Sequence, residues 1–208
     1  MQRLMSAAVA LPRGTSLVEV LVTLVITSYG LLGLTGLMSS MHVVQSEAFA
    51  RSQALLLLAD MTERIGAGNP QTAAAAATYA DPNNVGLLTP AGTGDSQPAD
   101  CNAAAAGGAR DVCEWSNLLK GISEKLGGNA VGAIHGARGC IELLTAPDDT
   151  IGVCRPATFR VSVAWQGMLV STAPGNGCGR NLYGTADGAR RVLAEQVTVG
   201  LPRCTVNN

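Results

Sequence analysis

The feature that most constrains the fold is a long apolar run near the N-terminus, beginning LVEVLVTLVITSYGLLGLTGLM. From Leu17 to Met41 the only charged residue is Glu19. At 1.5 Å per residue this run forms about 37 Å of helix, which is enough to cross a hydrocarbon core of about 30 Å with some tilt. The run therefore predicts a single membrane-spanning helix.

The presence of the charged residue Glu19 in this apolar run requires an explanation. A charged side chain at the centre of a bilayer costs roughly 2.5–3.5 kcal/mol even on the lenient insertion scale. Because Glu19 lies only a few residues into the run, its side chain can reach the nearby membrane surface. Alternatively, a cation on a neighbouring helix offsets the cost inside a bundle. Taken alone, Glu19 fits both interpretations.

The basic residues before the run give an orientation. Arg3 and Arg13 lie in a segment without an acidic residue, and such charge favours the cytoplasmic side of a membrane. We therefore expect a single-pass membrane protein, with its N-terminus in the cytoplasm and the rest of the chain outside it. A conventional secretory signal ending at AAVA is the rival, but its apolar core, Leu4–Leu11, is short and interrupted by Ser6.

All six cysteines fall in the part expected outside the cytoplasm. An even number there predicts disulfides, whereas structural zinc sites usually contain close C-x₂₋₄-C pairs, and the sequence has none. Six cysteines allow 15 pairings, and the sequence does not select one. Our guess is sequential pairing, because each bridge then closes a modest loop: Cys101–Cys113, Cys140–Cys154 and Cys178–Cys204.

Beyond the span the pattern predicts an α+β fold. HVVQSEAFARSQALLLLADMTERI lacks Gly and Pro and carries an apolar stripe at spacings of 4, 3 and 4, so one helix should run from Thr15 to Ile65 and stop at GAGNP. Residues 71–109 are expected to form a long surface loop with a helical turn over 73–79. The stripe consists of Ala54, Leu58, Met61 and Ile65.

A second, short helix is expected in EWSNLLKGISEKL, with Trp115, Leu118, Leu119, Ile122 and Leu126 on one face. Strands are expected in GCIELLT, GVCRP, TFRVSVAWQ and RRVLAEQVTVGL. The third alternates apolar and more polar residues, as in a half-buried antiparallel strand, with Phe159, Val161, Val163 and Trp165 inward. The prediction is a long helix packed on a small antiparallel sheet with disulfide-pinned loops.

A basic leader, Gly14 and the stretch SLVEVLVTLVI together resemble the class III signal of type IV prepilins. GLLGLTGLM followed by AFARSQALLLLADMTERI is similar to minor pilins of the PilV type. The resemblance implies a type IV pilin-like fold, cleavage between Gly14 and Thr15, N-methylation of Thr15, and Glu19 as the fifth mature residue. The family usually has Phe where this chain has Thr15.

The resemblance also implies a domain organisation and a role. Residues 1–14 would be the leader, 15–41 the membrane and assembly helix, 42–66 its amphipathic continuation, and 67–208 the extracytoplasmic head. Glu19 would pair with the α-amine of a neighbouring subunit and set the register between helices. The partners implied are other pilins and minor pilins, prepilin peptidase and the inner-membrane assembly machinery.

The function implied is that of a minor pilin that is anchored in the inner membrane until it helps to initiate a type IV pilus or forms part of its tip, and then lies at the cell surface. Such pili serve cell adhesion and twitching motility. A type II secretion pseudopilin shares the N-terminal signal and is an alternative. A second alternative is an adhesive or DNA-binding tip module. Removal of the leader takes away two of the 14 basic residues and none of the 15 acidic ones. The 12 basic and 15 acidic residues that remain disfavour binding of nucleic acid.

No sequence pattern predicts an enzyme. His42 and His135 lie outside any G-x-S-x-G, H-E-x-x-H or Walker context. Asp148 and Asp149, in APDDT, are explained more simply by a turn than by a calcium site. We therefore expect no catalytic residues, no metal and no cofactor.

Overall fold

The computed structural model describes residues 14, 16–122, 124–130, 132 and 134–204. Contacts divide the chain into two units, one ending at Gln45 and a compact head beginning at Ser46. Helix α1 (Leu17–Gly68) is continuous in secondary structure across this division. The predicted start of the helix at Thr15 lies outside the described residues, and its end is three residues later than expected.

The second half of α1 supplies one wall of the core of the head. The predicted stripe is confirmed, because its four residues are the buried residues of α1: Ala54, Leu58, Met61 and Ile65. The helix ends where Asn69 adopts a left-handed conformation (φ 44°) and its N–H still reaches the carbonyl of Ile65. Pro70 follows, and proline cannot continue a helix.

The head contains a four-stranded antiparallel sheet, in the order β1-β4-β5-β6. The strands are β1 (Ala91–Gly92), β4 (Arg138–Thr145), β5 (Ala157–Gln166) and β6 (Arg190–Val199). A separate small hairpin joins β2 (Lys125–Leu126) to β3 (Asn129–Ala130). An α+β arrangement of one long helix and a small antiparallel sheet is therefore present, as predicted.

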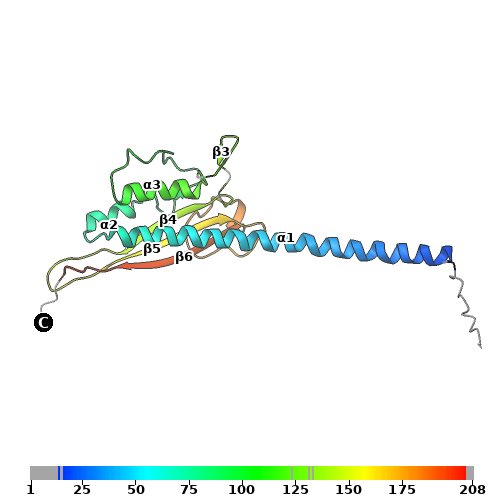
Figure 1. Cartoon of the computed structure of the whole chain (residues 1–208). Helices are drawn as coiled ribbons and strands as arrows, with labels where there is room; N and C mark the ends of the chain where they lie inside the picture. The colour runs from blue at the N-terminus through cyan, green and yellow to red at the C-terminus, as the bar shows by residue number, and fades with distance from the viewer. Residues whose placement is uncertain (1–13, 15, 123, 131, 133, 205–208) are drawn as a thin grey trace, which may run out of the picture. The chain divides into compact units, whose positions relative to one another are not determined.

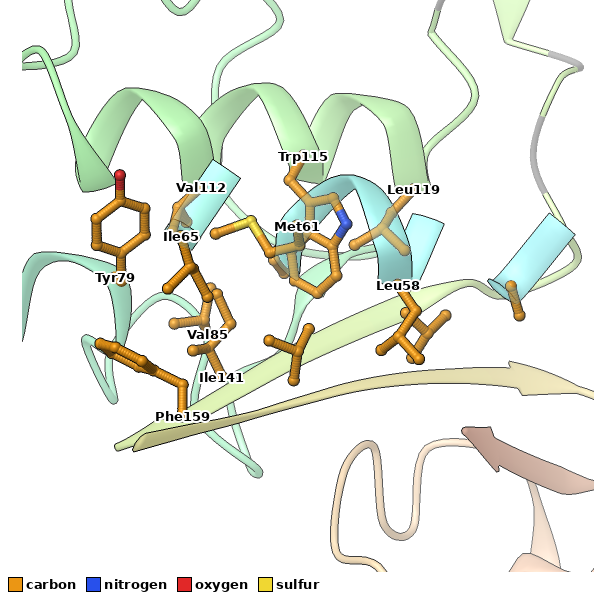
Figure 2. Packing of buried hydrophobic residues seen from close by; sticks show 14 of the residues in the cluster. Leu58, Met61, Ile65, Tyr79, Val85, Val112, Trp115, Leu119, Ile141 and Phe159 are labelled. Atoms are coloured by element: carbon orange, nitrogen blue, oxygen red, sulfur yellow. The ribbon is translucent and has the colours of Figure 1, made fainter. Parts of the chain in front are cut away.

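Within the head, α1, α2 (Ala73–Tyr79) and α3 (Gly108–Leu119) cover one face of the sheet (Figure 1). Trp115 joins the layers, because its indole Nε1 donates to the carbonyl of Leu57 at 2.8 Å. Its ring occupies the space that a Cβ at Gly139 of β4 would need. Figure 2 shows this core, in which Met61 and Ile65 of α1 lie between α3 and Phe159 of β5.

The opposite face of β5 is also covered at two positions in its second half, which differs from the half-buried strand that was predicted. Ser162 and Ala164 are both fully buried. The segment between β5 and β6 packs over them, and Cys178 and Tyr183 form a second apolar cluster with Ala164. This segment includes a short 3₁₀ helix, η1 (Thr185–Asp187).

The second helix lies earlier in the chain than the sequence pattern predicted. It begins at Gly108 and ends at Leu119, so Ile122 and Leu126 lie outside it, and Leu126 is 73% exposed. The reason is Gly121, whose φ of 67° ends the helix before the apolar periodicity does.

Two other segment predictions were wrong in part. The stretch 71–109 is not only a surface loop, because it contributes β1 and the buried Val85, whose carbonyl accepts the N–H of Ile141. GVCRP does not form a strand. It is a turn, closed by an isolated bridge between Asp148 and Arg155.

All six cysteines form disulfides, but two of the three guessed pairings were wrong. The bonds are Cys101–Cys113, as guessed, and Cys140–Cys178 and Cys154–Cys204. Strand register explains the difference. Cys140 lies near the start of β4, beneath the loop that carries Cys178, whereas Cys154 follows the other end of β4. The final strand ends there too, because Val199 pairs with Ala157.

Candidate functional site

The first half of α1 has no packing partner among the residues that the structure describes. Every described side chain from Leu17 to His42 is exposed, including the large apolar ones. Among the described residues, α1 is the one helix long and apolar enough to cross a membrane, although a signal sequence has the same properties. An apolar surface of this length is costly in water, so it needs lipid or other helices around it.

The hydroxyl groups along this half-helix suit an apolar environment. Thr23, for example, donates to the carbonyl of Val20 at 2.9 Å. Such bonds keep hydroxyl donors satisfied where no water is present. The same kind of bond to a carbonyl three or four residues earlier is made by Thr27, Ser28, Thr35 and Ser40.

Glu19 lies in the first turn of α1, not deep within it. The carbonyl of Ser16 accepts the N–H groups of Glu19 (3.0 Å) and Val20 (3.2 Å), so the helical bonds start at Ser16. Acidic side chains are stabilising in the first turn, because the N–H groups there carry partial positive charge. Ser16 and Glu19 also form the S-x-x-E pattern of a capping box, a signal in the sequence that the initial interpretation missed.

The structure therefore adds a local explanation for Glu19 to the two that the sequence left open. In that explanation, the carboxylate supports the start of its own helix. The side chain is exposed and therefore also accessible to a neighbouring molecule. Gly14 is exposed and outside regular structure, with no atom within 4 Å of the position of a Cβ, whereas Thr15 lies outside the described residues.

The remaining candidate residues are distributed over the surface. His42 and His135 are both exposed. Asp148 accepts the N–H of Thr150 at 3.1 Å and pairs with Arg155 at 3.7 Å. The hydrogen bond from Thr150 and the charge of Arg155 lower the pKa of Asp148. The turn interpretation of APDDT fits these contacts.

The end of the apolar half-helix is followed by a polar contact with the sheet. Glu47 pairs with Arg191 of β6, with Oε1 and Nε 2.9 Å apart. It also accepts the N–H of Met168 at 3.3 Å. This contact could not be predicted from the sequence, because 144 residues separate Glu47 from Arg191.

No family model, curated protein or solved structure matches the chain. The site therefore has to be interpreted from its own features. These are an uncovered apolar half-helix, a carboxylate in its first turn, and a disulfide-bonded head built on the second half of the same helix.

Proposed function

We propose that this protein is a minor pilin, anchored in the inner membrane by the first half of α1 and then incorporated into a type IV pilus. The observation that carries the proposal is the uncovered apolar half-helix with Glu19 in its first turn. A simple anchor needs the apolar length but not the carboxylate. A helix that moves from lipid into a helical bundle has a use for both.

The mechanism proposed is helix packing with a charge that sets the register. After cleavage at Gly14, the new α-amine of a neighbouring subunit carries a positive charge near the start of its helix. In a low-dielectric bundle, the carboxylate of Glu19 and this amine stabilise each other. Only one axial offset between two helices satisfies both charges, so the pair fixes the position of the subunit.

Two substitutions at Glu19 separate the three explanations. Glu19→Ala removes the charge and the capping group, whereas Glu19→Gln removes the charge alone, since Gln also serves in a capping box. Intermolecular pairing predicts that both variants fail to assemble. A capping role predicts that only the Ala variant is impaired, and a side chain that only reaches the membrane surface predicts no change in either.

The measurement is the ratio of the protein in sheared filaments to that in membranes. An unpaired amine in a bundle costs about 3–5 kcal/mol, so we expect both variants to lower the ratio by about 100-fold or more. Thr23→Ala is the matched control, because Thr23 lies one turn along the same side of α1 and its hydroxyl bonds only within the helix. A normal ratio for Glu19→Gln would refute the proposed pairing.

The same experiment addresses the neighbouring function. A type II secretion pseudopilin would use the same anchor and the same pairing. If the wild-type protein is absent from sheared pili but is required for the secretion of folded proteins, the assembly that this subunit joins is a pseudopilus and not a pilus.

A further inference from the structure

The segment after β5 presents three consecutive apolar side chains to solvent. Met168 is 64% exposed, Leu169 61% and Val170 84%. No charged residue occurs from Gly167 to Gly179. Consecutive exposed apolar residues of this kind usually mark a surface that contacts lipid or protein.

The backbone beneath these side chains is held in place. Arg191 donates from Nη2 to the carbonyl of Leu169 at 2.6 Å while its Nε binds Glu47. The N–H of Met168 donates to Glu47, and the N–H of Ser171 donates to the carbonyl of Gly188 at 2.8 Å. The backbone polar groups of the loop are thus bound to α1, β6 and Gly188, while its three apolar side chains keep most of their surface exposed.

The loop is anchored to α1 directly after the apolar run. Ser46 contacts the sulfur of Met168, and Glu47 binds its N–H. Ser46 follows Met41 by five residues, or about 7.5 Å of helix. The polar layer on each side of a hydrocarbon core is about 5–7 Å thick. If α1 crosses the membrane, its turn at Ser46 is therefore expected at the outer edge of the lipid headgroups, and a tilt of the helix brings it closer to the core.

Phe49 enlarges the same apolar surface. It is 65% exposed and lines an open cavity of about 390 Å³ together with Met168 and Ala50. Glu47 adds no net charge beside the loop, because it is paired with Arg191. Glu124 and His135, both exposed, line the polar side of the cavity. The surface therefore suits uncharged lipid, with apolar insertion rather than attraction to anionic headgroups as the binding force.

We propose that Met168, Leu169 and Val170 insert into the interfacial layer of the membrane leaflet on the side of the head. This inference rests on the membrane anchoring in the proposed function and adds a second contact with the bilayer. The contact holds the head against the membrane before assembly and is lost when the subunit leaves the bilayer. A second copy of the chain covering these residues is the competing occupant.

The test uses the full chain in phosphatidylcholine vesicles that contain lipids brominated near the headgroup end of the acyl chains. The two native tryptophans, Trp115 and Trp165, are buried, so a tryptophan added at the surface reports separately. Val170→Trp is the probe, and Leu169→Trp is a second probe in case one position disturbs the loop. We expect both to lose emission to the brominated lipid and to shift to shorter wavelength.

Two controls separate the inference from the function on which it rests. Ile151→Trp adds a probe at a residue 69% exposed in the loop at the other end of β5, and it should keep its emission. Leu24→Trp, within the apolar run, should be quenched if α1 is in the membrane.

Quenching of Leu24→Trp without quenching of either loop probe overturns the loop contact and leaves the anchor intact. If neither brominated lipid nor aqueous iodide quenches the loop probes, protein covers them. That result overturns the proposal in favour of a second copy of the chain. An unquenched Leu24→Trp removes the anchor, and with it both the proposed function and this inference.

Discussion

The side chain of Arg190 is expected to be a main determinant of stability in the head. It is 1% exposed and donates from Nε to Asp187 at 2.8 Å. Its terminal nitrogens donate to three backbone carbonyls of the segment that covers the second face of the sheet, those of Pro174, Asn176 and Cys178. One guanidinium thus compensates a buried carboxylate and organises a loop of about a dozen residues.

Arg190→Met removes these contacts while keeping most of the apolar volume. Asp187, 5% exposed, is then left as a buried charge without its partner, which costs about 3–5 kcal/mol. The three carbonyls also lose a donor, so we expect a loss near the upper end of that range. With an m-value of about 2 kcal/mol/M, the urea midpoint falls by roughly 2 M.

The assay is urea unfolding of the full chain in mild detergent, followed by tryptophan fluorescence, because both tryptophans are buried in the head. Arg180→Met, an exposed arginine of the same segment, is the control and should change stability by no more than about 0.5 kcal/mol. The double variant Arg190→Met with Asp187→Asn should be more stable than Arg190→Met alone. A double variant no better than the single one would refute the charge argument.

Four further outcomes are expected. Mass spectrometry of the mature protein should find Thr15 at the N-terminus, and a start inside the apolar run would reject cleavage at Gly14. Gly139→Ala should destabilise the head by about 1–3 kcal/mol, because the new methyl group would meet the indole of Trp115. Gly66→Ala should stabilise it by about 0.5–1 kcal/mol, because Gly66 lies in α1 with open space around it. Urea midpoints measure both changes. Burial and a hydrogen bond to the carboxylate of Asp111 raise the pKa of Tyr79. The stability that Tyr79 contributes is therefore complete below about pH 10, where unfolded tyrosine ionises, and falls as the pH rises further. Urea midpoints measured from about pH 8 to 11 should fall less steeply in Tyr79→Phe.

The elements with strong local signals were predictable from the sequence. The stripe from Ala54 to Ile65 has helical spacing and no glycine or proline within it, and all four of its residues are in the core. The alternation in β5 likewise identified the four residues that face the helices, which are Phe159, Val161, Val163 and Trp165. Local periodicity was sufficient in both cases because a single face of each element is buried by the main core.

The parts that depend on tertiary register were not predictable. Ser162 and Ala164 are buried by a segment more than ten residues further along the chain, and the bond between Cys140 and Cys178 is part of that same layer. The end of α3 at Leu119 had a local signal in Gly121, but the apolar periodicity continued past this glycine and concealed the end of the helix. For the candidate site, the sequence identified Glu19 but not its place in the first turn of α1. The roles of Gly14, Thr15 and Glu19 stay predictions.

The distribution of the disulfides has a mechanical consequence. All three bonds join residues from Cys101 onward, whereas α1 ends at Gly68. Within the head, α1 is therefore held by side-chain packing and by noncovalent contacts such as that between Trp115 and Leu57. Tension applied along α1 loads those contacts and none of the covalent crosslinks. Under sufficient force, α1 would separate from the head, while the disulfides keep the sheet and loops of the head crosslinked.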